Sequence, residues 1–186
     1  GMGEAGHRVV IEEFMAGEEA SLFILADGTD FVSLGTAQDH KRAFDGDRGP
    51  NTGGMGAYSP APVMTAEVTE RTLDRIVRPT LAEMARRGTP FQGILYVGLM
   101  IAEGEPRLVE YNVRFGDPEA QVLAMRLGAQ MLDACLAAAD GSLAEARVTF
   151  AADHAMTVVI AAQGYPDAVQ RGEPIRLSET DDPRVK

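Results

Sequence analysis

Residues 19–35 read EASLFILADGTDFVSLG and decide the fold class. Two apolar runs, rich in residues that favour strands, lie on either side of Asp27-Gly28, a common turn pair. Runs joined by so short a turn pair antiparallel, because a parallel connection needs a dozen or more residues. The stretch therefore predicts two antiparallel strands, over residues 19–26 and 31–35.

Strand signals on both sides extend this pattern. Residues 7–14, HRVVIEEF, are β-branched, and we expect another strand there. Further strands are expected over residues 94–102 and 107–115, joined by the turn 103–106, and over residues 156–162. Because the strands come first and the turns are short, we predict an α/β fold of the α+β type, with a mostly antiparallel sheet and flanking helices.

A long helix is expected to follow the first strands. Thr65 can cap its start, and Arg87 lies near its end. Pro79 lacks an N–H group and leaves the Arg75 carbonyl without its helical donor, so a kink is expected there.

Two shorter helices are expected after the strand at residues 107–115. Asp117 should cap the first, with Pro118 at its first position and Glu119 near the positive end of the helix dipole. Gly128 should separate it from a second helix that ends near residue 139.

Composition restricts the partners of this chain. Its 186 residues are 45% hydrophobic and 24% charged, which is typical of a globular protein. A net charge of -11 repels phosphodiester backbones, so no nucleic-acid partner is expected. No apolar run reaches the length of a membrane span. The single cysteine, Cys135, is expected in the core, and it fits a reducing, cytoplasmic location.

A row of polar side chains is predicted in the segment LVEYNVRFGDPE, residues 108–119. In an extended strand Glu110, Asn112 and Arg114 share one face, while residues 109, 111, 113 and 115 share the other, the expected core side. A carboxylate, an amide oxygen and a guanidinium in one row suit a magnesium-bound phosphate. An edge strand with a solvated face explains the same pattern, so both interpretations stay open.

Residues 38–62 are rich in Gly, Pro, Asn and Asp, and we expect them to form a long loop. Loops of that length tend to be functional or disordered. His40, Lys41 and Arg42 concentrate positive charge at its start, and the segment GPNTGGMGAYSP, residues 49–60, follows. Glycines let backbone N–H groups approach an anion closely, which favours an anion-binding loop over a flexible surface loop.

A cluster of carboxylates flanks the expected turn at residues 16–17. Two acidic pairs, residues 12–13 and 18–19, could accept hydrogen bonds from an adenine amino group or from ribose hydroxyls. The backbone of Phe14 and Met15 could meet the edge of the adenine. A solvated hairpin rim is the alternative.

Four segments, in this order, closely resemble the phosphoribosylamine–glycine ligase family, also called glycinamide ribonucleotide synthetases, of the ATP-grasp superfamily. They are IEEFMAGEEAS, QDHKRAFDGDRGPNTGGMGAYSPAP, GILYVGLM and EYNVRFGDPEAQ. The resemblance runs from residue 3 to the C-terminus, and GPNTGGMGAYSP and RFGDPE are highly specific. It implies an ATP-grasp core and ATP-dependent joining of glycine to 5-phosphoribosylamine through glycyl phosphate, giving glycinamide ribonucleotide, ADP and phosphate.

The resemblance also implies ATP and Mg²⁺ (or Mn²⁺) as cofactors and a role for each matched residue. It assigns the metal to Glu110 and Asn112, the transferred phosphate to Arg114, and anionic substrate groups to Lys41 and Arg42. It assigns adenosine to Glu12, Phe14, Met15, Glu19 and His40, and glycine or the ribonucleotide to Asn51, Thr52, Gly53, Gly54, Met55, Gly56 and Asp117. The wider superfamily often has an acidic metal ligand on the preceding strand, and residues 94–102 offer none.

The same resemblance predicts the domain organisation. Residues 1–150 are expected to form an ATP-grasp core that lacks most of the lid subdomain, and residues 151–186 the beginning of an incomplete C-terminal domain. The chain would then be the central piece of a larger ligase, inactive without the missing domains. Two alternatives stay open: another ATP-grasp carboxylate–amine ligase or carboxylase, or a non-catalytic truncated fragment.

Overall fold

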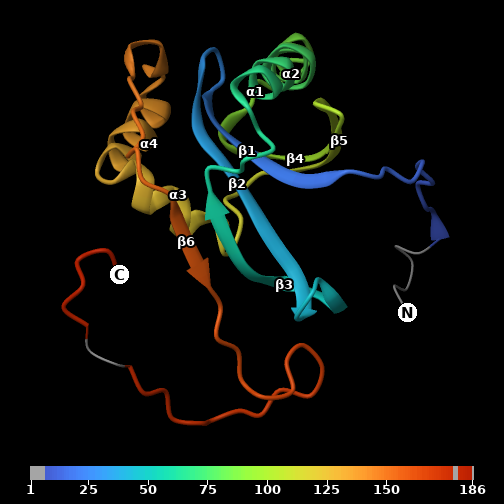
Figure 1. The fold of residues 1–186 in the computed structure, drawn as a ribbon. Helices are drawn as coiled ribbons and strands as arrows, with labels where there is room; N and C mark the ends of the chain where they lie inside the picture. The colour runs from blue at the N-terminus through green and yellow to red at the C-terminus, as the bar shows by residue number, and fades with distance from the viewer. Residues whose placement is uncertain (1–6, 178–179, 186) are drawn as a thin grey trace.

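The computed structural model describes residues 7–177 and 180–185. Its strands form one six-stranded sheet in the order β5-β4-β1-β2-β3-β6, with antiparallel pairing throughout. Helices flank this sheet (Figure 1), which confirms the predicted fold class. In chain order the elements are β1 (Glu18–Asp27), β2 (Phe31–Phe44), β3 (Arg48–Ser59), α1 (Ala66–Thr72), the π-helical turn η2 (Leu73–Val77), α2 (Arg78–Arg86), β4 (Gln92–Ala102), β5 (Glu105–Asn112), α3 (Glu119–Leu127), α4 (Gln130–Asp140), the 3-10 turn η3 (Leu143–Glu145) and β6 (Ala155–Val158).

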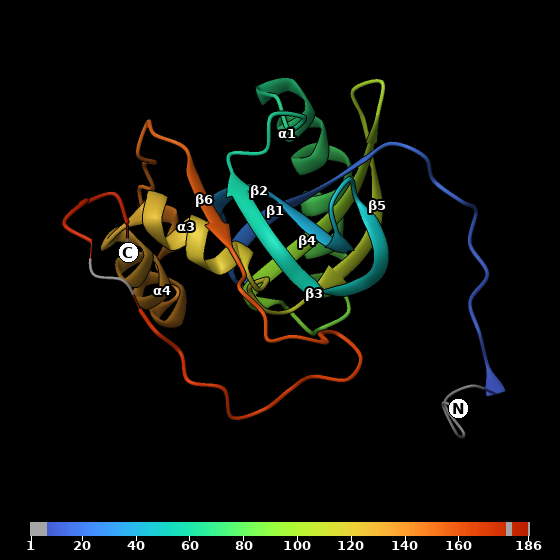
Figure 2. The same ribbon diagram turned by 60° about the horizontal axis from the view of Figure 1, so that its bottom comes forward.

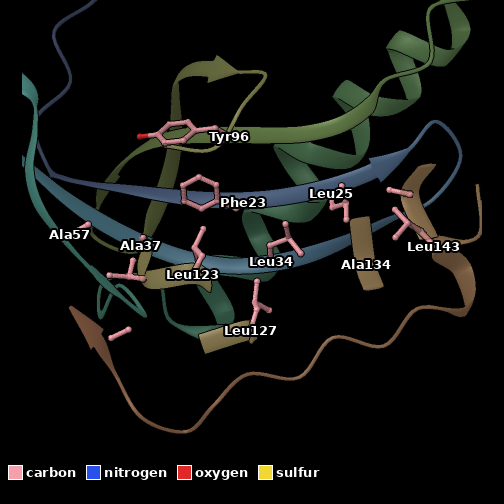
Figure 3. Packing of buried hydrophobic residues seen from close by; sticks show 13 residues of the cluster. Phe23, Leu25, Leu34, Ala37, Ala57, Tyr96, Leu123, Leu127, Ala134 and Leu143 are labelled. Carbon is pink, nitrogen blue, oxygen red and sulfur yellow. The ribbon is translucent and has the colours of Figure 1, made fainter. Parts of the chain in front are cut away.

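Both faces of the sheet are covered, because the inner strands are apolar on both sides. Phe23 of β1 lies in one core with buried residues of α3 and α4, and Figure 3 shows it beside Tyr96 of β4. Leu22 and Ile24 belong to a second core on the other face, which α1 and η2 cover. Cys135 packs, partly buried, against the first core as expected.

The expected long loop at residues 38–62 is instead most of a hairpin. β2 continues to Phe44, turns at residues 45–47 and returns as β3, so that Asp39 pairs with Ala57. The glycines of β3 hid this strand, because glycine lowers strand propensity. At Gly54 the reason for glycine is close contact: a Cβ there would lie 2.6 Å from Pro118 Cδ.

The expected strand at residues 7–14 is absent. Within the described residues no strand pairs with this segment, which extends away from the sheet in Figures 1 and 2. Ile11 and Phe14 are 91% and 92% exposed. Strand propensity alone does not make a strand, because the backbone N–H and C=O groups need a neighbouring strand for their hydrogen bonds.

The expected helix over residues 65–87 is present, with a local irregularity. The Thr65 side chain caps it by accepting a hydrogen bond from the Val68 N–H at 3.2 Å. The interruption expected at Pro79 takes the form of the π-helical turn just before it. There the N–H of Arg78 donates to the carbonyl of Leu73, five residues back.

The predicted cap at Asp117 is wrong. Pro118 has non-helical dihedral angles and is itself the N-cap of α3, while the Asp117 carboxylate accepts a hydrogen bond from Gln121 Nε2 at 3.0 Å. The break at Gly128 is confirmed.

In the described ranges no single helix is both long and apolar enough to cross a membrane. The helices α3 and α4 together reach that length and hydropathy, but they are bent by 99° at their junction.

Two expected strands end earlier than their sequences suggest. β5 stops at Asn112 and lies at the edge of the sheet. Tyr111 packs on one core as expected, but Val109 and Val113 of the predicted core side are 41% and 73% exposed. β6 stops at Val158 and pairs with β3. The domain boundary at residue 150 stays a prediction.

Candidate functional site

A cavity of about 640 Å³ lies between the N-terminal segment and the β2–β3 hairpin. It joins three regions that are separate in the sequence: the acidic pair at residues 18–19, the basic cluster of β2 and the beginning of β3. It collects seven of the residues that sequence analysis assigned to ATP or to substrate: Phe14, Met15, Glu19, His40, Lys41, Arg42 and Asn51.

A smaller cavity of about 170 Å³ shares three lining residues with the larger one, Glu19, Asp39 and Lys41. Its walls come from β1, β2, β4 and β5. On β5 its lining includes Glu110, which lies opposite Gly98 of β4. The sheet order therefore places a predicted metal ligand, Glu110, and one residue of the basic cluster, Lys41, on the wall of one small cavity.

Lys41 is the cation at which the two cavities meet. Its Nζ lies 3.2 Å from a Glu19 carboxylate oxygen and 3.8 Å from Asp39 Oδ2. Burial alone would lower the pKa of Lys41, but the charges of Asp39, Tyr96 and Glu19 outweigh burial and raise that pKa. Lys41 therefore carries its positive charge at neutral pH, as contact with an anionic group requires.

Two buried carboxyl groups lie near Lys41. The Asp39 side chain is 7% exposed, and Glu119 is 3% exposed. Burial raises the pKa of Asp39, and Glu19 adds to the rise while Lys41 opposes it. Burial also raises the pKa of Glu119, with a further contribution from the charge of Asp39. The structure thus concentrates negative charge in a poorly solvated region, which is common at binding sites.

Tyr96 connects this region to the core. Its hydroxyl accepts a hydrogen bond from Ser21 Oγ at 2.7 Å, and burial raises its pKa to about 12. Its ring meets Phe23 edge to face, with centroids 5.0 Å apart, and Figure 3 shows its hydroxyl pointing away from the cluster. Tyr96 is therefore fixed by packing and stays protonated.

Gly116 makes room for the buried acid. A Cβ at residue 116 would overlap the carboxylate of Glu119. Every residue other than glycine has a Cβ that would occupy this space. The position of Glu119 therefore explains the glycine in RFGDPE.

Glu110 and Asn112 lie together, as their alternation on β5 predicts. Asn112 Nδ2 donates to Glu110 Oε1 at 3.0 Å, which directs the amide and the carboxylate to the same place. Asn112 Oδ1 and Glu110 Oε2 provide the hard oxygen donors that Mg²⁺ prefers. Among the described residues no group of three or more His, Cys, Asp or Glu could hold a metal by itself. The pair fits a metal whose remaining ligands are phosphate oxygens and water.

Nine predicted site residues line neither cavity: Asn112, the five residues 52–56 of β3, and Arg114, Asp117 and Glu12. Arg114 donates from Nη1 to the Phe115 carbonyl at 2.7 Å, and Asp117 bonds to Gln121. Glu12 is exposed in the N-terminal segment, whose neighbouring Glu13 forms an ion pair with Arg107. The assignments of Arg114, Asp117 and Glu12 stay predictions.

The remaining substrate candidates lie along β3, and several of their polar groups have partners within the protein. Thr52 Oγ1 donates to the Lys41 carbonyl at 2.8 Å and accepts from the Gly54 N–H at 3.0 Å. The Gly53 N–H donates to the Tyr165 hydroxyl at 3.2 Å, and the Met55 carbonyl accepts from Val159 at 2.9 Å. Gly56 pairs with Val158 of β6. Anion binding by residues 52–56 stays a prediction.

Sequence reasoning missed four residues of this region: Ser21, Asp39, Tyr96 and Glu119. Asp39 lay inside the basic cluster and Glu119 in RFGDPE, but neither was assigned to the site. The sequence did contain one signal for Asp39, because a carboxylate next to two cations often forms an ion pair with one of them. Tyr96 and Ser21 belong to apolar strands, and only the pairing of β1 with β4 brings them together.

Comparison with known proteins shows which family this chain resembles. The family model described as "Phosphoribosylglycinamide synthetase, ATP-grasp (A) domain" matches residues 1–120. A phosphoribosylamine–glycine ligase from Mesorhizobium japonicum is 59% identical over 174 residues, which cover 94% of this chain and 41% of that protein. One from Vigna unguiculata is 52% identical over 179 residues, covering 95% of this chain and 58% of that protein.

Solved structures agree with these sequence relatives. The crystal structure of phosphoribosylamine–glycine ligase from Thermotoga maritima matches with a TM-score of 0.82 at 38% identity, covering 91% of this chain and 42% of that chain. A phosphoribosylglycinamide synthetase from Anaerococcus prevotii matches with a TM-score of 0.60 at 14% identity, which shows the fold alone. The chain spans about 41% of the length of the Mesorhizobium relative.

Proposed function

Because the chain belongs to the family of phosphoribosylglycinamide synthetase ATP-grasp (A) domains, we propose that it forms the central part of a ligase of purine biosynthesis. The reaction would join glycine to 5-phosphoribosylamine at the expense of ATP and release glycinamide ribonucleotide, ADP and phosphate. The names of the sequence relatives support this reaction. A cytoplasmic location, consistent with one free cysteine, is part of the proposal.

The observation that carries the proposal is the meeting of two cavities at Glu19, Asp39 and Lys41. A nucleotide requires a space of several hundred cubic ångströms, which the cavity of about 640 Å³ provides. Phe14 and Met15 would lie against adenosine, together with Glu19 and His40.

We assign the phosphate end of the nucleotide to the cationic and metal-binding residues. Lys41 and Arg42 would contact anionic substrate groups, and Arg114 would contact the transferred phosphate. When bound, Mg²⁺ would neutralise phosphate charge between Glu110 and Asn112. Asn51 and residues 52–56, with Asp117, would contact glycine or the ribonucleotide.

In the proposed reaction the carboxylate of glycine attacks the γ-phosphorus, and the bond between that phosphorus and the bridging oxygen to the β-phosphate breaks. The glycyl phosphate formed is an activated acyl group. The amine of phosphoribosylamine then attacks the acyl carbon, phosphate leaves with its electron pair, and the amine loses a proton. The protein's contribution is positioning and charge neutralisation, since phosphoryl transfer needs little covalent help.

A chimeric ligase tests this proposal. This chain would replace the matching segment of the Mesorhizobium japonicum ligase, and the assay would follow ADP, phosphate and the amide product. We expect ligation of glycine to phosphoribosylamine, and loss of most of that turnover in Glu110→Gln. Glu103→Gln, in the exposed turn between β4 and β5, is the matched control and should leave turnover unchanged.

Two results would contradict the assignments. A chimera that folds and consumes bicarbonate or another acid in place of glycine would make the protein a different ATP-grasp enzyme. Full turnover of Glu110→Gln at limiting Mg²⁺ would show that Glu110 is not a metal ligand.

A further inference from the structure

The sequence contains three Asp-Gly pairs, at residues 27–28, 45–46 and 140–141. In such a pair the backbone nitrogen of the glycine can attack the side-chain carboxyl carbon of the aspartate, because glycine has no side chain that hinders the approach. The reaction needs a carboxyl group that is free and a glycine nitrogen that can move toward it. The fold determines both conditions, and they differ among the three pairs.

The pair at residues 27–28 is protected through its carboxylate. Asp27 Oδ1 accepts hydrogen bonds from the backbone N–H groups of Thr29 at 2.9 Å and Asp30 at 2.7 Å, and Oδ2 accepts from Leu143 at 3.0 Å. These bonds lower the pKa of Asp27, the one from Asp30 most strongly, so the group stays ionised at neutral pH. An ionised carboxylate that is fixed in place is a poor target for a nucleophile.

The pair at residues 140–141 is protected through its backbone. Asp140 is the last residue of α4, and the Gly141 N–H donates to the carbonyls of Ala137 and Ala138. The N–H of Ser142 donates to the Ala137 carbonyl as well, at 2.8 Å. A helix end closed in this way holds the glycine nitrogen in place. That nitrogen cannot reach the Asp140 carboxyl group unless the last turn of the helix opens.

Neither kind of protection exists at Asp45. Residues 45–47 form the exposed turn between β2 and β3. The hydrogen bonds and ion pairs of the described residues include none to the Asp45 carboxylate and none from the Gly46 N–H. The surroundings of Gly46 are also open, because a Cβ placed there would meet Arg48 Nε as its nearest atom, at 3.9 Å. An exposed turn without these bonds is free to bring the nitrogen to the carboxyl group.

We propose that Asp45 is a modification site, at which the aspartyl residue isomerises to isoaspartate through a cyclic succinimide with Gly46. In the first step the Gly46 nitrogen bonds to Asp45 Cγ, and the hydroxyl of the protonated carboxyl group leaves as water with the amide proton. Water then adds to the main-chain carbonyl carbon of residue 45, and the bond from that carbon to the Gly46 nitrogen breaks. One water is released and one is consumed, so no other reactant is required.

The modification would alter the wall of the larger cavity, which Arg42 and Asp47 line. In the product the main chain runs through Cγ of residue 45, which adds one atom to the turn. The two strands are paired up to Phe44 and Arg48, and Arg42 Nη1 donates to the Gly49 carbonyl at 2.7 Å. The lengthened turn changes the register of this last pair. Isomerisation would therefore move cavity residues without replacing any of them.

Incubation of the folded chain at neutral pH and physiological temperature tests the assignment. Isoaspartate has the mass of aspartate, so digested samples are separated by chromatography and the isoaspartyl peptides are identified by electron-transfer fragmentation. We expect isoaspartate to accumulate roughly tenfold faster or more at residue 45 than at residues 27 and 140, because hydrogen bonds must break first at those two pairs. In guanidinium chloride, which removes the protection, the three rates should become similar.

Asp45→Glu is the decisive variant. It keeps the negative charge, but its longer side chain closes a ring with the next nitrogen far more slowly, so residue 45 should stay unmodified. Asp140→Glu makes the same change at another exposed Asp-Gly pair and should leave the rate at residue 45 unchanged. Amide signals of residues 42–49 in NMR should change during incubation of the wild type and stay constant in Asp45→Glu.

Two outcomes overturn the inference. Isoaspartate that forms at residue 27 or 140 of the folded chain as fast as at residue 45 shows that the protective hydrogen bonds do not control the reaction. An Asp45 that stays unmodified in the folded chain, while the denatured chain converts it, shows that the turn itself is protected. Neither result bears on the proposed ligase function, because the modification requires no ligand.

Discussion

Gly116 and Glu119 depend on each other, and this dependence can be measured. In Gly116→Ala the new methyl group overlaps the Glu119 carboxylate, which must move within a packed region. We expect the free energy of unfolding to fall by about 1–3 kcal/mol, the usual cost of overpacking. In a Glu119→Ala background the methyl group meets no carboxylate, so the same substitution should cost little. Urea denaturation of the four proteins gives the coupling energy.

Gly53→Ala is the control for the loss of a glycine. A Cβ at residue 53 would lie 3.6 Å from the Tyr165 hydroxyl, an ordinary contact, and the change should be small. Additive effects of Gly116→Ala and Glu119→Ala would contradict the assigned role of Gly116.

Glu119 should also make stability depend on pH. Burial raises its pKa in the folded protein above the ordinary 4.5, so the folded state holds the proton more tightly than the unfolded state does. The stabilisation is complete below 4.5 and is lost as the pH rises through the folded-state pKa. Glu119→Gln cannot ionise. We therefore expect the stability of wild type, relative to this variant, to fall as the pH rises above that range.

Urea denaturation of both proteins over a pH series measures this difference. Carboxylates that do not interact with Glu119 contribute equally to both curves and cancel in the comparison, whereas Asp39, whose charge acts on Glu119, contributes to the difference. Glu18→Gln removes a carboxylate from the exposed start of β1 and provides the surface control. A pH-independent difference between wild type and Glu119→Gln would show that the Glu119 carboxyl is equally solvated in both states.

At the scale of elements, the cap of α1 gives a test of the long helix. Thr65 Oγ1 accepts from the Val68 N–H, one of the donors that a helix start leaves unpaired. Thr65→Ala should lower the free energy of unfolding by about 1 kcal/mol. Thr65→Ser keeps the hydroxyl and should recover most of the loss. Thermal or urea unfolding measures both, and equal losses would show that the hydroxyl is not the source of the stabilisation.

The elements that sequence predicted well are those whose local pattern agrees with their surroundings. Residues 19–35 contain two apolar runs and a turn pair, and they form the predicted hairpin. Residues 7–14 have equally good strand residues but no described partner, and propensity could not reveal that. The prediction missed the strand β3 because of its glycines. Gly54 lies against Pro118 and Gly56 against the Thr157 carbonyl, and only the tertiary structure creates these contacts.

The candidate site likewise contains residues that the sequence predicted and residues that it could not predict. Glu110 and Asn112 follow from alternation along one strand, which the sequence displays directly. Asp39 and Tyr96 come from different strands and meet across the sheet because of its strand order. Their burial, which gives them altered pKa values, depends on packing that no local pattern contains.

At the scale of the whole molecule, we expect this chain by itself to show no ligase turnover. The larger cavity is bordered by the N-terminal segment, where Phe14 is 92% exposed, so water has free access to a bound nucleotide. Water weakens each electrostatic contact and would hydrolyse an acyl phosphate. Incubation with ATP, Mg²⁺, glycine and fresh phosphoribosylamine measures the turnover. Product formation at the rate of the chimeric ligase would contradict this expectation.

The sheet order has a consequence for synthesis on the ribosome. β1 is an inner strand that pairs with β2 on one side and with β4 on the other, although β4 begins 65 residues after β1 ends (92 − 27). At a translation rate of about 5–20 residues per second, β1 waits roughly 3–13 s for that second partner. During this interval its apolar residues and unpaired backbone edge are available to any other strand in the cell. Nascent chains should therefore need a chaperone most while residues 28–91 are being made.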